Sequence, residues 1–255
     1  MTMALITGGT SGIGASFARA LAARGDDLVL VARNADRLAE IATEITQRYG
    51  VQVETISADL GSRDDTVRVA ERAASTEQPI DTLINNAGFG IPRKLTGSDL
   101  SEHENGIDVM IRAVLIVAGA AGQAMAARGS GAIINVSSTA GFVTMGGYSA
   151  IKAWVTTYSE GLANELSGTG VTVTALCPGW VRTEFHERAD IRVSKIPGAM
   201  WLDADALVAE CLQDVERGKV ISIPTKRYQA LIFAARHAPR AIVRAASVKM
   251  SSGRH

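Results

Sequence analysis

The sequence is poor in cysteine and histidine, and each shortage excludes a class of protein. Its two cysteines, Cys177 and Cys211, are too few for a disulfide framework. We therefore expect a reducing compartment and a cytoplasmic location. The four histidines form no ligand-spaced pair, so we expect no metal site. Lys plus Arg and Asp plus Glu number 26 each, and this zero net charge gives no reason to expect a nucleic-acid partner.

Long hydrophobic runs are also missing. The longest apolar stretch, Ala113–Ala127, contains Gln123 and is shorter than the roughly 20 residues that a membrane span needs. Residues 3–7 have no basic flank and run directly into a glycine loop, which predicts a strand and not a signal peptide. The hydrophobic content of 47% is nevertheless enough for a buried parallel sheet covered on both faces.

Short β-branched runs alternate with longer amphipathic runs along the whole chain. The predicted strands are Ala4–Thr7, Leu28–Ala32, Val51–Ile56, Thr82–Asn85, Ala132–Val136, Val171–Leu176 and Val220–Ile223. The predicted helices are Ile13–Arg24, Ala35–Tyr49, Arg63–Thr76, Ile107–Arg128, Tyr148–Leu166 and Ala204–Glu216. This alternation is typical of βαβ units and predicts an α/β fold: a doubly wound, mostly seven-stranded parallel sheet of Rossmann type.

No Pro/Ser/Gly-rich linker and no repeat divides the chain. We therefore predict a single domain over residues 1–255. It would include an irregular segment over 184–202 and a helical tail over 225–255.

A glycine-rich loop, Thr7-Gly8-Gly9-Thr10-Ser11-Gly12-Ile13-Gly14, follows the first predicted strand and opens the first helix. Glycines let the backbone approach a pyrophosphate, and a helix N-terminus offers free N–H groups to the anion. The spacing is GxxxGxG and differs from the usual GxGxxG, and a purely structural turn is the alternative. The candidate cofactor contacts are Gly8, Thr10, Ser11, Gly12, Ile13 and Gly14.

The end of the second predicted strand reads Val31-Ala32-Arg33-Asn34. An acid in this place would contact the ribose 2′-OH of NAD, about 20 residues past the glycines. None is present, and the Arg33 guanidinium would favour the 2′-phosphate of NADP. The alternative is that Arg33 only begins a solvated helix. We expect NADP(H) as the cofactor in preference to NAD(H).

Tyr148 and Lys152 lie four residues apart at the start of a predicted helix, and therefore on one face. An ammonium near a phenol favours the phenolate, so we expect Lys152 to lower the Tyr148 pKa from about 10. Such a tyrosine can exchange a proton near neutral pH. The same YxxxK pattern is also common in surface pairs.

Ser138 stands at the carboxyl end of a predicted strand, the edge where ligands gather in doubly wound sheets. Its hydroxyl could donate to a carbonyl oxygen and stabilise developing negative charge. The alternative is a strand-terminal cap.

Together these segments resemble the short-chain dehydrogenase/reductase family over nearly the whole chain. The ordered motifs are TGGTSGIG, Asp59-Leu60, Asn85-Asn86-Ala87-Gly88, Asn135-Val136-Ser137-Ser138, YSAIK and Cys177-Pro178-Gly179. The resemblance implies that Tyr148 is the general acid/base and Ser138 orients the carbonyl. It implies that Lys152 tunes Tyr148 and binds the nicotinamide ribose. The further cofactor contacts that it implies are Asp59, Leu60, Asn86, Ala87, Gly88, Tyr148, Pro178, Gly179, Val181 and Thr183.

Two departures from the family pattern stand out. Many members carry an asparagine where this chain has Met110, and a thioether cannot replace an amide in a proton path. Asn105 is near in sequence but out of register. The segment between Ser138 and Tyr148 is also short, so we expect an unusual pocket entrance.

The variable substrate segment of the family falls on residues 180–201. Its aromatic and apolar members favour a hydrophobic alcohol or ketone as substrate. Alternatively, these side chains only pack the loop down, and His186 is a loop residue and not a catalytic one. The members are Trp180, Phe185, His186, Met200 and Trp201.

No acidic residue follows Glu216, whereas basic and apolar residues continue to the end. A basic amphipathic helix can lie on anionic lipid. From the sequence alone, a packed or subunit-contacting helix with a solvated basic face is the interpretation we favour. Relatives associate through helices corresponding to Ile107–Arg128 and Tyr148–Leu166, so a homodimer or homotetramer is expected.

The sequence thus predicts hydride transfer between NADP(H) and a carbonyl or secondary alcohol of a small, apolar molecule. An NADP(H)-binding regulatory or sensor protein with little turnover remains the alternative, because of Met110.

Overall fold

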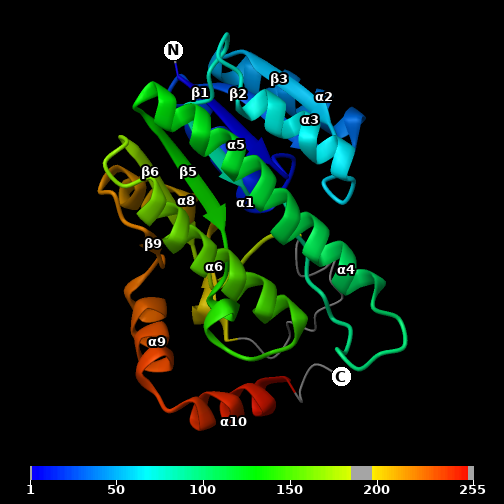
Figure 1. The fold of residues 1–255 in the computed structure, drawn as a ribbon, viewed down its shortest axis with the longest axis vertical. Helices are drawn as coiled ribbons and strands as arrows, with labels where there is room; N and C mark the ends of the chain where they lie inside the picture. The colour runs from blue at the N-terminus through cyan, green and yellow to red at the C-terminus, as the bar shows by residue number, and fades with distance from the viewer. Residues whose placement is uncertain (1, 185–196, 252–255) are drawn as a thin grey trace.

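The computed structural model describes residues 2–184 and 197–251 (Figure 1). Seven parallel strands form one sheet, in the order β3-β2-β1-β4-β5-β6-β9. The strands are β1 (Met3–Thr7), β2 (Asp27–Ala32), β3 (Val53–Ser57), β4 (Thr82–Asn85), β5 (Gly131–Val136), β6 (Val171–Leu176) and β9 (Ile221–Ser222). The chain starts in the centre, winds to one edge, and then returns to wind to the other, which confirms the predicted doubly wound sheet.

Helices cover both faces of this sheet. One face is covered by α1 (Gly12–Ala22), α2 (Ala35–Tyr49) and α8 (Ala204–Glu216). The other is covered by α3 (Arg63–Ala73), α5 (Ala113–Arg128) and α6 (Gly147–Glu165). Central strands such as β1 are buried on both faces and therefore read as continuous apolar runs in the sequence.

The structure differs from the single helix that the sequence predicts over Ile107–Arg128. The helical run begins earlier, with α4 (Ser101–Ile107), and passes through a π-helical turn over Asp108–Arg112 before α5. A π turn inserts one extra residue into the helical repeat, and the apolar periodicity does not announce it.

This run, Ser101–Arg128, is long and apolar enough to cross a membrane by length and composition. Only 44% of its most apolar window is buried, yet α5 packs closely on α3 and β5. A core helix of a soluble protein passes the same test, so the run is weak evidence for a membrane span.

The predicted helical tail consists of α9 (Lys226–His237) and α10 (Arg240–Ser251). Figure 1 shows both helices at one end of the molecule, on the side toward which β5 points. A short ribbon, β7 (Trp180–Val181) paired with β8 (Trp201–Leu202), and a 3₁₀ turn over Gly198–Met200 border the segment 185–196, which lies outside the described residues.

Candidate active site

Most of the predicted site residues follow the carboxyl ends of sheet strands, and Tyr148 and Lys152 lie in α6. The glycine loop follows β1, Arg33 follows β2, Asp59 follows β3, residues 86–88 follow β4, and Ser138 follows β5. Pro178 and Gly179 follow β6 in the same way. Because the strands are parallel, these positions share one edge of the sheet, where doubly wound folds bind ligands.

Ser138 and Tyr148 come together at this edge. Ser138 caps a 3₁₀ turn over Thr139–Phe142, where its Oγ accepts a hydrogen bond from the Ala140 N–H at 3.1 Å. Tyr148 is the second residue of α6, and its side chain is hydrogen-bonded to that of Ser138. Although the segment between Ser138 and Tyr148 is short, it still allows the two side chains to form a pair.

Lys152 lies one turn further along α6 and is buried. Its Nζ donates to the Val136 carbonyl oxygen at 2.9 Å and lies 5.6 Å from the centre of the Tyr148 ring. Burial lowers the pKa of Lys152 to about 8, and the interaction with the nearby Cys177 thiol opposes this shift only in part. A buried ammonium therefore stands beside the phenol, as the sequence predicts.

The predicted direction of the Tyr148 pKa shift is wrong. Tyr148 as a whole is only partly buried, but its hydroxyl lies in dense surroundings, and this burial raises its pKa above the usual value. The hydrogen bond with Ser138 lowers the pKa, yet by less than burial raises it. Lys152 lies over the ring and donates to a main-chain carbonyl, and it is not among the causes of the shift.

A buried polar network fixes α6 against the sheet beneath these side chains. Asn85 Nδ2 donates to Asn135 Oδ1 at 2.9 Å, and Asn135 Nδ2 donates to Ser159 Oγ at 3.0 Å. Ser137 Oγ donates to the Lys152 carbonyl oxygen at 2.7 Å. Buried polar groups need such partners, and here the partners fix the position of the helix that carries Tyr148 and Lys152.

The glycine loop is held by the segment after β4. Asn86 Nδ2 donates to the carbonyl oxygens of Thr7 and Gly8, at 3.0 and 3.1 Å. The Thr7 hydroxyl accepts from the Asn86 and Ala87 N–H groups. A Cβ on Gly14 would lie 2.2 Å from the Gly8 carbonyl oxygen, so only glycine fits there.

These residues fit a bound dinucleotide. The loop lies at the N-terminus of α1, which has no acidic residue in its first turn and so leaves the positive dipole end uncompensated. Gly12 has φ +53° and faces Thr183, whose side chain lies 3.3 Å from where a Cβ would be. The glycine loop and the segment after β6 therefore face each other across one edge of the sheet.

Arg33 and Asp59 lie at the ends of β2 and β3 and are both exposed. Within the described residues, the Arg33 guanidinium has no hydrogen-bond or ion-pair partner, whereas nearby Arg37 pairs with Glu40. Asp59 Oδ1 accepts from the Gly61 N–H at 3.0 Å, and Leu60 is buried beside it. Among the described residues, the Arg33 guanidinium is thus an unpaired cation at the end of β2, where the sequence predicts a contact with the 2′-phosphate of NADP.

Met110 lies at the centre of the π turn and is fully buried. The point where a Cβ on Gly88 would be is 3.0 Å from Met110 Sδ and 3.7 Å from Lys152 Nζ. The thioether therefore occupies the neighbourhood of Lys152, as the family alignment implies. Asn105 is exposed on α4 and faces Gly61, so it does not substitute for the missing amide.

Two residues that support the site were missed by the sequence reasoning. The buried ring of His103 packs against Gly147, directly before Tyr148, and its Nε2 has no partner among the described residues. The Tyr228 hydroxyl accepts from the Trp180 N–H at 3.0 Å and donates to the Met200 carbonyl oxygen at 2.7 Å. Neither residue belongs to a motif, so no local signal marks them.

The described aromatic residues of the predicted substrate segment pack mainly on one another. The Trp180 and Trp201 rings lie 6.0 Å apart at 58°, and Trp180 and Met200 also contact the core around Tyr228. This favours the packing interpretation for these three residues. Phe185 and His186 lie outside the described residues.

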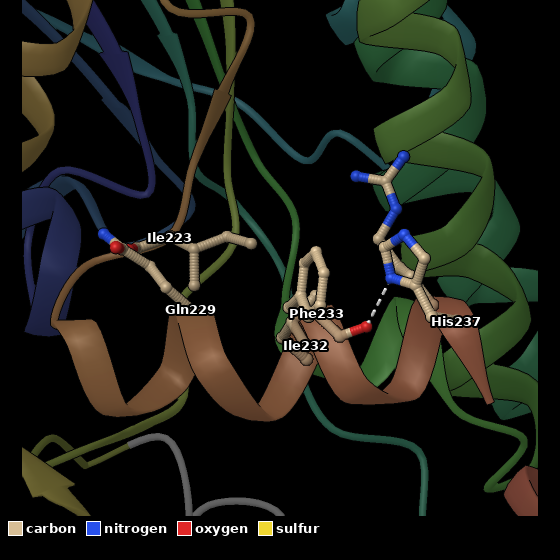
Figure 2. Close-up of a pocket in the computed structure, with 6 residues that line it drawn as sticks. Ile223, Gln229, Ile232, Phe233 and His237 are labelled. Atoms are coloured by element: carbon tan, nitrogen blue, oxygen red, sulfur yellow. Dashed lines mark hydrogen bonds between the residues drawn. The ribbon is translucent and has the colours of Figure 1, made fainter.

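A hollow beside α9, drawn in Figure 2, contains none of the predicted site residues. In the described part of the chain, no cluster of His, Cys, Asp or Glu is arranged to hold a metal ion.

The fold and this edge define a Rossmann-type dinucleotide-binding protein. The sequence model of the short chain dehydrogenase family matches residues 2–192. The chain belongs to this family of oxidoreductases, which act on alcohol and carbonyl groups.

Individual relatives support this family membership. An uncharacterised oxidoreductase of Staphylococcus saprophyticus is 39% identical over 191 residues, covering 74% of this chain and 82% of its own. A short-chain dehydrogenase from Sphingobium yanoikuyae, solved in complex with NADPH, is 36% identical, with a TM-score of 0.84 over 92% of this chain and 94% of its own. A bulky-bulky ketone specific alcohol dehydrogenase from Comamonas testosteroni is 30% identical, with a TM-score of 0.80 over 94% of this chain and 96% of its own.

Proposed function

We propose that the chain is an NADP(H)-dependent reductase/dehydrogenase acting on a carbonyl or secondary alcohol of an apolar small molecule. The observation that carries this proposal is the hydrogen-bonded Ser138–Tyr148 pair beside the buried Lys152 ammonium, at the carboxyl edge of the sheet. The ketone-specific relative from Comamonas testosteroni supports the substrate class.

A nicotinamide, when bound, exchanges a hydride with the substrate carbon. In reduction, the Ser138 hydroxyl donates a hydrogen bond to the carbonyl oxygen and stabilises the negative charge that develops there. Tyr148 gives its phenolic proton to that oxygen, so that the alcohol leaves neutral. Tyr148 carries this proton at neutral pH, although burial raises its pKa and makes it a weaker acid than an ordinary phenol.

The remaining residues hold the cofactor in this proposal. Lys152 binds the nicotinamide ribose, the glycine loop holds the pyrophosphate at the N-terminus of α1, and Asp59 holds the adenine. The segments after β4 and β6, including Gly88, Pro178 and Thr183, border the ring and ribose.

Replacing Tyr148 with Phe tests the catalytic assignment. The variant keeps the ring but loses the proton, so we expect NADPH oxidation with a panel of ketones to fall by a factor of about 10² to 10⁴, with NADPH affinity unchanged. Ser149→Ala is a nearby hydroxyl control, although Ser149 also accepts from the Met145 N–H. If wild type binds NADPH but oxidises it with no ketone or alcohol at any pH, the alternative of an NADP(H) sensor, motivated by Met110, replaces this proposal.

NADP(H) preference rests on Arg33. We expect Arg33→Ala to weaken NADP⁺ binding by roughly 10- to 100-fold, because a charge-assisted hydrogen bond contributes about 1.5–3 kcal/mol. NAD⁺ affinity should change little, and Arg37→Ala, one helical turn away, should change neither. Equal affinities of the wild-type protein for NADP⁺ and NAD⁺ would contradict the proposed preference for NADP(H).

We also infer a cytoplasmic location and a homodimer or homotetramer. The location is supported by Cys177 and Cys211, which are both free and buried, with thiol pKa values raised to about 11 and about 12 by burial. The oligomer is supported by the exposed apolar residues of the α4–α5 run, among them Leu115.

A further inference from the structure

The zero net charge of the chain conceals a separation of charge along the sequence. Nine of the 26 Lys and Arg residues follow Glu216, and none of the 26 Asp and Glu residues does. The first 216 residues therefore carry a net charge of −9 and the rest carry +9. Composition taken over the whole chain cannot reveal this segregation.

The positive charge is exposed on α9 and α10, which we call the C-terminal arm (Lys226–Ser251). Its exposed cations are Lys226, Arg227, Arg236, Arg240 and Arg244. None of them forms an ion pair with a residue that the structure describes. By contrast, Lys219, just before the arm, pairs with Asp214 at 2.6 Å.

The arm also exposes large apolar side chains among these cations. Leu231, Phe233, Ile242 and Val248 are 51%, 64%, 59% and 66% exposed. Phe233 and His237 rise from one side of α9 in Figure 2 and, with Ile223, Gln229, Ile232 and Arg236, line a hollow of mixed apolar and polar character with a basic end. Helices that lie in a membrane interface combine exposed large apolar side chains with Lys and Arg.

The arm is held in a fixed direction. It leaves the sheet at Thr225, whose φ of +72° is unusual for a residue with a side chain and whose N–H donates to the Glu210 carboxylate. Tyr228 anchors α9 in the core, and Ile232 is also buried. The Ser247 hydroxyl of α10 accepts from the Thr144 N–H at 3.1 Å. The exposed cations and apolar groups are therefore preorganised.

We propose that the C-terminal arm is a docking surface for anionic phospholipid bilayers. A bilayer of this kind offers phosphate charge and hydrocarbon within one interface, which matches the mixed basic and apolar surface of the arm. The acidic remainder of the chain is repelled by the same surface, so the arm alone faces the lipid.

This orientation has a consequence for the site. Thr144 and Phe142, which contact Ser247 and Arg236 of the arm, belong to the segment between Ser138 and Tyr148. Docking through the arm therefore brings the carboxyl edge of the sheet close to the bilayer, where an apolar substrate concentrates. This consequence rests on the proposed function, whereas the docking itself does not.

Vesicle co-sedimentation tests the docking without any turnover assay. We expect the wild-type protein to sediment with vesicles of about two parts phosphatidylcholine to one part phosphatidylglycerol, and not with phosphatidylcholine alone. Binding should disappear near 1 M salt, where the Debye length is about 3 Å. The double variant Arg240→Gln/Arg244→Gln should bind roughly 10- to 30-fold more weakly, and Leu231→Ser/Ile242→Ser should weaken binding at low salt.

The matched control is Arg48→Gln/Arg63→Gln, which removes two exposed cations from the acidic part of the chain. It should bind the vesicles as wild type does, and circular dichroism should show all variants folded. Absence of wild-type binding to anionic vesicles, equal binding to neutral ones, or an equal loss in the control would overturn the proposal. So would sedimentation equilibrium in which the arm variants only dissociate a dimer, or arm-dependent binding to duplex DNA without vesicle binding.

Discussion

At the scale of single residues, the site is set by burial more than by charge pairing. Lys152 and Tyr148 both lie in desolvated surroundings, and burial shifts both pKa values toward the neutral forms. A spacing of four residues places the two side chains on one face but does not say how deeply either is buried. The expectation of a lowered Tyr148 pKa was wrong because it considered the nearby Lys152 ammonium and not the desolvation of the phenol.

The Lys152 pKa predicts a dependence of stability on pH. Its folded-state pKa of about 8 lies below the ordinary value of 10.5, so between these values the unfolded chain binds more protons than the folded one. Stability contributed by this residue should therefore rise with pH, by roughly 2 kcal/mol from about pH 7 to about pH 9.5.

Urea unfolding of wild type and Lys152→Met at several pH values measures this contribution, because the difference cancels other titrating groups. Wild type should gain stability relative to the variant as pH rises. A difference that stays constant across this range would mean that Lys152 has an ordinary pKa.

Met110 illustrates what one residue can reveal before the structure is known. Its alignment with the family asparagine predicts a departure in the site, and the structure places its thioether beside Gly88 and near Lys152. The π turn that carries it is not visible in the sequence, because an apolar residue at this position fits an ordinary helix equally well.

At the scale of elements, the segment after β6 depends on a residue far away in sequence. A Cβ on Gly179 would lie within 2.0–2.4 Å of three atoms of the Tyr228 ring. This ring is buried, and its hydroxyl is hydrogen-bonded to the Trp180 N–H and to the Met200 carbonyl oxygen. The start of α9 therefore positions the stretch proposed to border the nicotinamide.

Gly179→Ala should for this reason destabilise the protein by about 1–3 kcal/mol and weaken NADP⁺ binding, because the Tyr228 ring must move. Gly161→Ala is the matched control: Gly161 lies in α6 with open space around it, and alanine there should be neutral or stabilise by up to about 1 kcal/mol. Urea denaturation midpoints and NADP⁺ titration measure both effects. Equal stability of the two variants would show that the ring has room to shift.

At the scale of the whole molecule, we propose that residues 1–255 unfold as one domain, since strands from both ends of the sequence share one sheet. NADP⁺ at about 100 times its Kd should then stabilise the entire fold by about 2.7 kcal/mol. For a domain of this size, that corresponds to a rise in Tm of roughly 5–10 °C.

Differential scanning calorimetry can measure this shift, and Tyr148→Phe should retain it whereas Arg33→Ala should lose most of it. Two separate transitions, of which only one responds to NADP⁺, would show that the chain contains two domains.

The sequence by itself determined the sheet, its central strands and the residues that meet at its carboxyl edge. Buried strands must be apolar, tight turns near phosphates need glycine, and parallel strands end at one edge, so each of these features leaves a local trace. Gly14, Ser138, Tyr148 and Lys152 could be placed on these grounds.

Only the tertiary structure decided the rest: the upward shift of the Tyr148 pKa, the π turn at Met110, the contacts of His103 and Tyr228, and the exposure of the C-terminal arm. Each of these depends on which side chains far apart in sequence come into contact and exclude water. Desolvation and packing are properties of that three-dimensional neighbourhood, and no local pattern of residues encodes them.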